Sequence, residues 1–273
     1  MDNLKDKVIF ITGATRGIGR AIALHAAKDG AIIAVTGKTD KPHPILPGTI
    51  FSVAEEIEQA GGTAIPLVLD VRDEKQIQTA VDQVGRQFGR IDVLINNASA
   101  IQLTSTPNTP LRKFDLLFAV NVRATFAVGQ ACIPYLEKAV NPHILTLSPP
   151  LNLDPKWFGH HLAYTMSKYG MSMCTLGWAE ELRDRGIAAN SLWPRTTIAT
   201  MAIKAHFPEA VWQASRHPEI MADAAHWILT QNSRHVTGHF FIDEDALKQA
   251  GISDFSAYAV NPEAPLMEDL FLS

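Results

Sequence analysis

The chain has 273 residues, of which 47% are hydrophobic and 19% are charged, and its formal net charge is −4. This composition is typical of one large globular α/β domain and excludes a disordered or fibrous chain. The acidic balance lacks the basic footprint of a nucleic-acid-binding protein, so we expect no nucleic-acid partner.

The two cysteines, Cys132 and Cys174, lie far apart and show neither CxxC nor Cys/His spacing. This usage favours a reduced compartment and predicts no metal site. No run reaches the roughly 18 uninterrupted apolar residues of a membrane span. The first residues are charged and lack the apolar core of a secretory signal. We therefore expect a cytoplasmic protein with no membrane span.

Short apolar runs alternate with helical patterns along the chain. The predicted strands cover residues 7–12, 31–36, 64–69, 93–96, 143–147 and 188–192. The predicted helices are one that begins near Ile18, followed by 51–59, 74–88, 114–136 and 164–183. Such alternation implies a parallel sheet covered on both faces. We predict a single domain of class α/β over residues 1–273, built on a three-layer, Rossmann-type doubly wound parallel sheet.

Two connecting segments are longer than the alternation requires. Residues 39–48 carry three prolines between a strand and its helix. Residues 194–214 follow the sixth predicted strand and hold hydroxyl, aromatic and aliphatic side chains, as a substrate lid would. For both segments an ordinary surface loop is the alternative.

Residues 243–273 form a C-terminal extension outside the alternating pattern. Apolar side chains in and beside it need a surface to cover. We expect them to pack on a neighbouring subunit, which predicts a homodimer or homotetramer. These side chains are Ile242, Leu247, Phe255, Tyr258 and Leu270.

A glycine-rich turn at residues 12–19 lies between the first predicted strand and the first helix. Glycine lets the backbone turn sharply and approach a pyrophosphate at the helix N-terminus. A glycine cluster alone is weak evidence, but this one follows a strand and opens a helix, as a dinucleotide site requires. The predicted cofactor-binding residues of the turn are Gly13, Thr15, Arg16, Gly17, Ile18 and Gly19.

The end of the second strand bears on the choice of cofactor. A carboxylate there would accept hydrogen bonds from the ribose 2′-hydroxyl of NAD and repel the 2′-phosphate of NADP. The sequence instead places Lys38 at this point, and Arg16 is a second cation that could face the same pocket. We therefore predict NADP, while Asp40 beyond Lys38 keeps NAD as the alternative.

Tyr164 and Lys168 lie at the start of the last predicted helix. Their i to i+4 spacing puts the phenol and the ammonium on one helix face. A phenol is a poor base near neutrality, but an adjacent cation stabilises its phenolate. The pair therefore predicts proton exchange with a substrate alcohol or carbonyl.

Together these motifs resemble the short-chain dehydrogenase/reductase family over essentially the whole chain. Further matching positions follow the third, fourth and sixth strands and lie in the helix predicted at 114–136. They are Asp70, Val71, Asn96, Asn97, Ala98, Asn121 and Pro194. The resemblance implies that Asp70, Val71, Asn97, Ala98 and Pro194 belong to the cofactor site.

The resemblance also implies individual roles. Asp70 would contact the adenine, and Asn97 would support the cofactor ribose region. Lys168 would bind the nicotinamide ribose and lower the pKa of Tyr164. Asn121 would hold a water molecule in the proton relay.

Three positions depart from the family pattern, and one of them is Ser99, where the family often has glycine and where we expect the change to be tolerated. The family's catalytic serine usually lies closer to the tyrosine than Ser148 does, and Pro149 and Pro150 follow Ser148. Ser148 is the best candidate for that serine if residues 157–161 loop out, and a core or capping hydroxyl is the alternative. Arg195 replaces a common glycine, and it could pair with an acidic substrate group or form a surface salt bridge.

These observations predict an NADP(H)-dependent oxidoreductase that interconverts an alcohol and a carbonyl by hydride transfer. The predicted catalytic residues are Tyr164, Lys168, Asn121 and Ser148. The expected partner is a small carbonyl or alcohol substrate, with a lipid-like or acyl compound as one candidate class. A dinucleotide-binding regulatory module with weak or lost catalysis is the alternative, and reduction of a carbon–carbon double bond in an acyl thioester is a third option.

Overall fold

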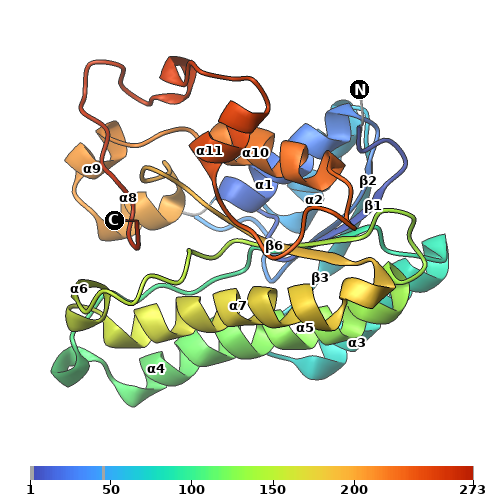
Figure 1. Cartoon of the computed structure of the whole chain (residues 1–273), viewed down its shortest axis with the longest axis horizontal. Coiled ribbons are helices and arrows are strands. Elements are labelled where there is room, and N and C mark those ends of the chain that lie inside the picture. The colour runs from blue at the N-terminus through green and yellow to red at the C-terminus, as the bar shows by residue number, and fades with distance from the viewer. Residues whose placement is uncertain (1–2, 45–46, 273) are drawn as a thin grey trace.

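A seven-stranded sheet runs through the middle of the molecule (Figure 1). The computed structural model describes residues 3–44 and 47–272. The strand order is β3-β2-β1-β4-β5-β6-β7, and neighbouring strands pair in parallel. The strands are β1 (Val8–Ile11), β2 (Ile32–Gly37), β3 (Thr63–Val68), β4 (Val93–Asn96), β5 (His143–Thr146), β6 (Ala188–Trp193) and β7 (Phe240–Ile242). β1 and β4 are buried along their whole length, as strands covered on both faces are.

Helices cover both faces of the sheet (Figure 1). One face carries α1 (Gly17–Lys28), α2 (Ile50–Gln59), α10 (Glu219–Thr230) and α11 (Asp243–Gln249), whose apolar side chains share one core cluster. The other face carries α3 (Glu74–Phe88), α5 (Ala124–Leu136) and α7 (Leu162–Glu181). The shorter helices are α4 (Leu111–Leu117), α6 (Lys156–Gly159), α8 (Met201–His206) and α9 (Glu209–Gln213), with single 3-10 turns at Thr106–Asn108, Arg183–Arg185 and Ser256–Tyr258.

One long helical stretch joins α4 to α5 through a π-helical turn at Phe118–Arg123. Within the described ranges, this stretch, Leu111–Leu136, is the one helix long and apolar enough to cross a membrane by length and composition. It contacts α3 and α7 and carries the buried polar residues Asn121 and Thr125, as a core helix of a globular domain does. The length and hydropathy match is therefore weak evidence for a span.

The predicted α/β class, doubly wound sheet and single domain are confirmed. Predicted helix 74–88 and strand 93–96 coincide with α3 and β4. The helix predicted at 114–136 begins earlier, at Leu111, and contains the π turn. The sequence analysis predicted no element beyond residue 192 and so missed β7 and the helices α8 to α11. β7, α8 and α9 have three to six residues, which is too short to show a period. α10, with 12 residues, is long enough to show one and was not recognised.

The C-terminal extension lies against this chain's own core. Leu247 is buried with α10, and Phe255 and Tyr258 pack against the same cluster. Leu270 packs against the cluster that contains Tyr164. The expectation that these side chains cover a neighbouring subunit is corrected here, because the chain itself already covers them. The connection predicted at 39–48 includes residues 45 and 46, which lie outside the described residues.

Candidate active site

Two adjoining hollows open at the carboxyl ends of the central strands. This is the edge of a doubly wound sheet where the strand order reverses and ligands bind. The first, the cofactor cleft, has a volume of about 530 Å³ and is lined by residues that follow β1 to β4. The second, the inner pocket, has a volume of about 240 Å³ and contains Tyr164 and Lys168. Ile18, Asn97 and Ser99 line both hollows, so the two adjoin.

Most of the predicted cofactor residues line the cofactor cleft. They are Gly13, Thr15, Arg16, Gly17, Ile18, Lys38, Asp70, Val71, Asn97 and Ala98. Pro194 and Lys168 line the inner pocket instead. The structure thus brings together residues that lie up to 181 positions apart, from Gly13 to Pro194.

The glycines of the first turn have conformations and contacts that other residues would disturb. Gly13 and Gly17 have φ values of +67° and +55°, in the left-handed region that favours glycine. A Cβ atom on Gly19 would lie 2.5 Å from Asn97 Nδ2 and 2.7 Å from the carbonyl oxygen of Gly13. Gly19 therefore lets α1 begin directly behind the turn.

Asn97 and Thr12 fasten the turn to the end of β4. Asn97 Nδ2 donates hydrogen bonds to the carbonyl oxygens of Thr12 and Gly13, both at 2.9 Å. Thr12 Oγ1 accepts the backbone N–H groups of Asn97 and Ala98, both at 3.0 Å. Asn97 thus holds the first turn against the end of β4, a contact that we call the brace. Its contact with the cofactor ribose stays a prediction.

Arg16 and Lys38 lie at the end of the cleft beyond β2. Arg16 donates a hydrogen bond of 2.9 Å to Thr39 Oγ1, while its buried Nε atom has no hydrogen-bond partner among the described residues. Lys38 is exposed and lines the same cleft. Two cations at one corner, one of them with an unused donor, are suited to bind an anionic group.

Asp70 is held in the cleft by its near neighbour Arg72. The Arg72 guanidinium donates to both carboxylate oxygens, with distances of 2.5 to 3.1 Å. These hydrogen bonds, more than the opposing effect of burial, lower the pKa of Asp70 to about 2. Asp70 is therefore a fixed anion at the adenine end, and its contact with adenine stays a prediction.

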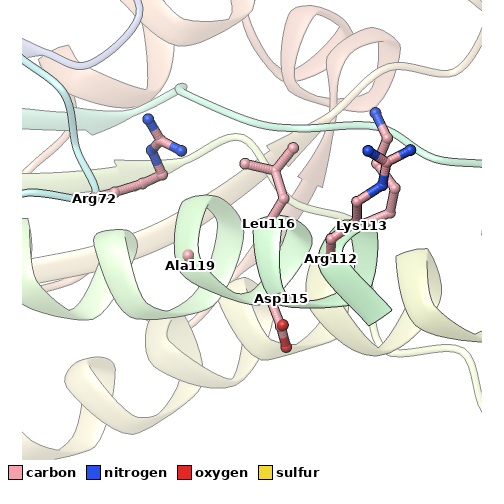
Figure 2. Close-up of a pocket in the computed structure, with 6 residues that line it drawn as sticks. All are labelled: Arg72, Arg112, Lys113, Asp115, Leu116 and Ala119. Carbon is pink, nitrogen blue, oxygen red and sulfur yellow. The ribbon is translucent and has the colours of Figure 1, made fainter. Parts of the chain in front are cut away.

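A third hollow of about 520 Å³ adjoins this end along α4. Figure 2 shows Arg72 on one side of it, Arg112 and Lys113 on the other, and Leu116 between them. Asp115 points away on the opposite side of the helix (Figure 2). Arg72 is the partner of Asp70, and Leu116 also lines the cofactor cleft. We assign this surface no further role.

Tyr164 and Lys168 project from the first turns of α7 into the inner pocket, as their spacing predicts. Tyr164 is 6% exposed, and its hydroxyl makes no hydrogen bond to a described residue. Lys168 Nζ donates to the carbonyl oxygen of Leu147 at 2.6 Å and lies 5.0 Å from the ring centre of Trp193. The phenol is thus available to a ligand, while the ammonium is held at the pocket wall.

Burial controls the protonation of this pair. Burial lowers the pKa of Lys168 to about 7, an effect that an ionised Asp269 would oppose. Burial raises the pKa of Tyr164 above its usual value, and an ionised Asp269 would raise it further. The expected lowering of the Tyr164 pKa by Lys168 is therefore corrected for this arrangement, because Lys168 is itself desolvated and turned toward Leu147. The raised pKa keeps the tyrosine neutral.

Asn121 lies in the π-helical turn and is fully buried. Its Oδ1 atom accepts the N–H of Ala100 at 2.7 Å, and its Nδ2 atom donates to Ser167 Oγ at 2.9 Å. The side chain thus ties the segment after β4 to α7, the helix that carries Tyr164. Its predicted role in holding a water molecule stays a prediction.

Ser148 does not face the inner pocket. Its hydroxyl is fully buried and forms a hydrogen bond of 2.9 Å with Ser191 Oγ on β6. The backbone just after it is tied to α7, because Ser172 Oγ donates to the carbonyl oxygen of Pro149 at 2.6 Å. The interpretation of Ser148 as the catalytic serine is therefore corrected in favour of a core hydroxyl.

Arg195 is engaged by α11. Its backbone N–H donates to Asp243 Oδ1 and its guanidinium to Asp245 Oδ2, both at 2.8 Å. This is the salt-bridge alternative of the two that the sequence allowed. Pro194, one residue earlier, does line the inner pocket.

Residues 194–214 lie over both hollows, as the lid prediction requires. Ile198, Ile203 and Phe207 line the inner pocket, and Met201 lines the cofactor cleft. Opening and closing of this segment stays a prediction.

The sequence analysis missed the last pocket wall, the C-terminal strap, which we define as residues 267–272. Thr197 N–H donates to the carbonyl oxygen of Met267 at 3.0 Å, and Trp193 Nε1 donates to that of Leu270 at 2.9 Å. Phe271 is fully buried, with its ring centre 6.3 Å from that of Tyr164. Trp193, which the sequence analysis did not single out as a pocket residue, likewise lines the pocket, with its ring next to Lys168 Nζ.

Comparison with known proteins agrees with this geometry. A family model described as short chain dehydrogenase matches residues 7–209. The chain belongs to the short chain dehydrogenase family. It is 57% identical over 264 residues to hydroxysteroid dehydrogenase-like protein 2 of Danio rerio and 53% identical to the Homo sapiens protein of that name. These matches cover 97% of the chain but 63% of each relative's length.

Solved structures show the same fold. A short chain dehydrogenase from Mycobacterium thermoresistibile is 49% identical, with a TM-score of 0.94 over 99% of this chain and 96% of that one. A short-chain type dehydrogenase/reductase from Mycobacterium marinum is 26% identical, with a TM-score of 0.75 over 88% and 94% of the two chains. Conservation of the fold therefore extends well beyond the close relatives.

The family binds a nicotinamide dinucleotide, and the residues of the cleft fit such a group. Gly13 and Gly17 of the first turn have left-handed backbone conformations. A Cβ atom on Gly13 would lie 3.1 Å from Ala98 Cα, so glycine keeps this part of the turn free of side chains. The turn opens α1, whose N-terminal N–H groups favour phosphate. The buried, unused Arg16 Nε supplies a further donor. Among the described residues no group of three or more His, Cys, Asp or Glu could hold a metal ion.

Gly19→Ala tests the brace between the turn and β4. The added methyl group would force Asn97 or the turn to move, so we expect a loss of about 1–3 kcal/mol in the free energy of unfolding and weaker dinucleotide binding. Thermal unfolding and fluorescence titration with NADPH measure the two effects. Gly159→Ala is the control, because its Cβ would meet nothing within 4 Å. Unchanged NADPH affinity in Gly19→Ala would contradict the proposed brace.

Proposed function

We propose that the protein is an NADP(H)-dependent oxidoreductase that interconverts a carbonyl compound and an alcohol. The observation that carries the proposal is an unpaired, buried phenol in a pocket that adjoins the cofactor cleft and shares lining residues with it. Bound in the cleft, the dinucleotide would supply or accept a hydride. The chain's own side chains would donate the proton, supply positive charge and bind the substrate.

Tyr164 is the acid in this proposal. Because its pKa is raised by burial, it holds its proton until a substrate oxygen develops negative charge and takes that proton. Lys168, positioned by Leu147 and Trp193, supplies positive charge one helical turn away. A neutral tyrosine favours reduction of the carbonyl as the working direction.

The inner pocket selects an apolar substrate. Its walls include Ile101, Leu103, Ile198, Ile203 and Phe207. Burial of aliphatic surface against these side chains contributes about 25 cal/mol per Å². We therefore propose aliphatic aldehydes, ketones or acyl compounds as the substrate class, with the lid residues 194–214 excluding water.

A regulatory dinucleotide-binding module is the second candidate, and the core position of Ser148 is the observation that favours it. The two functions are distinguished by following NADPH absorbance with a panel of aldehydes, ketones and acyl thioesters. Tight NADPH binding without oxidation over the whole panel would favour the module.

Tyr164→Phe removes the proton donor and keeps the ring. We expect turnover to fall by about 10²–10⁴-fold with NADPH affinity nearly unchanged, whereas Lys168→Ala should lower both. Tyr169→Phe is the matched control, because that phenol lies on the same helix but donates to the carbonyl oxygen of Asn152. Steady-state kinetics and NADPH titration measure these effects, and wild-type turnover in Tyr164→Phe would refute the assigned role.

The choice of NADP over NAD is part of the proposal and depends on Arg16 and Lys38. Lys38→Glu should weaken NADPH binding at least about tenfold, or about 1.4 kcal/mol, while NADH binding is retained or improved. Lys41→Glu makes the same charge change three residues further along the chain and serves as the control. Calorimetric titration with both cofactors decides the point, and equal losses for NADPH and NADH would count against it.

We also propose a homodimer through the outer faces of α5 and α7. Exposed apolar side chains gather there, including Phe126, Met173 and Leu176, which are 53%, 58% and 50% exposed. Contiguous exposed apolar surface of this kind marks association sites. We propose a second copy of this chain as the occupant, because α5 and α7 contact each other and each carries exposed apolar side chains.

Met173→Glu should convert the dimer to a monomer, because it buries an unpaired charge in the interface. Light scattering coupled to size-exclusion chromatography measures the mass. Val140→Glu, at a residue 93% exposed outside both helices, is the control. A monomeric wild-type protein, or an unchanged mass for Met173→Glu, would overturn the assignment.

A further inference from the structure

Asp269 lies on the C-terminal strap at the wall of the inner pocket. Its backbone N–H donates to the carbonyl oxygen of Arg195 at 3.1 Å, which fixes the residue beside the end of β6. Its Oδ1 atom accepts the N–H of Leu270 at 2.7 Å. Its Oδ2 atom has no hydrogen-bond partner in the part of the chain that the structure describes. One carboxyl oxygen is thus free to meet a ligand.

Several other polar side chains of the inner pocket are engaged within the chain. Ser99 Oγ donates to Asn121 Oδ1, Thr197 Oγ1 is bonded to Ser215 Oγ, and Asn97 braces the first turn. Thr200 lines both hollows, and Glu268, which also lines the inner pocket, interacts within the chain. Asp269 therefore brings an unengaged carboxyl oxygen to the same pocket wall as Tyr164.

The groups that face Asp269 come from two elements. Tyr164 and Lys168 face it from α7, and Asp243 faces it from the first residue of α11. Burial, and then the charge of Asp243, raises the pKa of Asp269 to about 7, while Lys168 opposes this effect. Asp243 is itself fully buried, with an Oδ2 atom that has no partner. The surroundings thus disfavour a second carboxylate.

We propose that Asp269 is a further catalytic residue, whose protonated carboxyl donates a hydrogen bond to the substrate oxygen beside Tyr164. This inference rests on the proposed oxidoreductase function. It assigns to the strap the hydrogen bond that Ser148, turned into the core, does not supply. A carboxylic acid kept neutral by its surroundings is a known way to stabilise a developing oxyanion.

The proposed carbonyl reduction needs only the hydride of the bound dinucleotide and the proton of Tyr164. The carbonyl carbon gains a hydride, the electron pair of the C=O π bond moves to oxygen, and that oxygen takes the proton of Tyr164. Asp269 keeps its proton and its hydrogen bond throughout. Solvent later returns one proton to the phenolate.

The experiment compares Asp269→Ala and Asp269→Asn with nonanal and 2-nonanone as probes. Asp269→Ala should lower kcat about 10²-fold, the scale of losing one oxyanion-hole donor, with NADPH affinity unchanged. Asp269→Asn keeps a neutral donor and the acceptor for Leu270, so its kcat should stay close to that of wild type below pH about 7. Above that pH, the kcat of wild type should fall more steeply than the kcat of Asp269→Asn. Asp269→Ser, which keeps a hydroxyl donor, replaces Asp269→Asn if that variant does not fold.

A second readout does not depend on activity. A carboxyl whose folded-state pKa is raised destabilises the folded protein as pH rises through the interval between the unfolded and folded pKa values. The unfolding temperature of Asp269→Asn relative to wild type should therefore increase from about pH 4 to about pH 7 and level off above that. Glu263→Gln, an exposed change in the same extension, is the control and should show no such trend.

The outcomes separate this inference from the proposed function. Tyr164-dependent turnover with wild-type kcat in Asp269→Ala would overturn the role of Asp269 and leave the oxidoreductase standing. Equal damage in Asp269→Ala and Asp269→Asn at every pH would also overturn it, because the carboxylate rather than the acid would then be required. No turnover in wild type with any probe would instead remove the proposed function.

Discussion

The position of the whole site depends on one side-chain amide. Asn97, at the end of β4, holds the carbonyl oxygens of Thr12 and Gly13 at the end of β1. These strands are neighbours in the sheet, and the chain leaves them toward opposite ends of the strand order. A crevice must open between such connections. The amide joins the two sides of that crevice, and Gly19 allows α1 to approach it.

Inside the crevice, desolvation determines which protonation states persist. Lys168 is 2% exposed and is compensated by one carbonyl oxygen and an aromatic face rather than by a bonded carboxylate. A buried cation of this kind loses affinity for its proton, just as buried acids hold theirs more tightly. Burial therefore raises the pKa values of two acids in the inner pocket, Tyr164 and Asp269.

Sequence patterns predicted the parts of the site whose positions follow from the strand order. Residues that directly follow β1, β2, β3 and β4 must meet at one edge of a parallel sheet, so the turn, Lys38, Asp70 and Asn97 could be placed without coordinates. The i to i+4 spacing likewise put Tyr164 and Lys168 in one pocket. Ser148 could not be placed in this way, because its orientation depends on how α7 holds the backbone after Pro149.

The strap escaped prediction for a related reason. Its path depends on backbone hydrogen bonds to residues 195 and 197 and on the fit of Phe271 among Tyr164, Trp193 and Trp157, which no local periodicity encodes. The apolar residues of this irregular tail suggested contact with a neighbouring subunit, but they cover apolar surface of their own chain. The two features that the sequence did not predict correctly, the orientation of Ser148 and the path of the strap, concern the same pocket. The segment after β5 turns one hydroxyl into the core, while the strap brings a carboxyl to the same pocket, so the hydrogen-bonding capacity of the site is kept by a residue far outside the family's motifs.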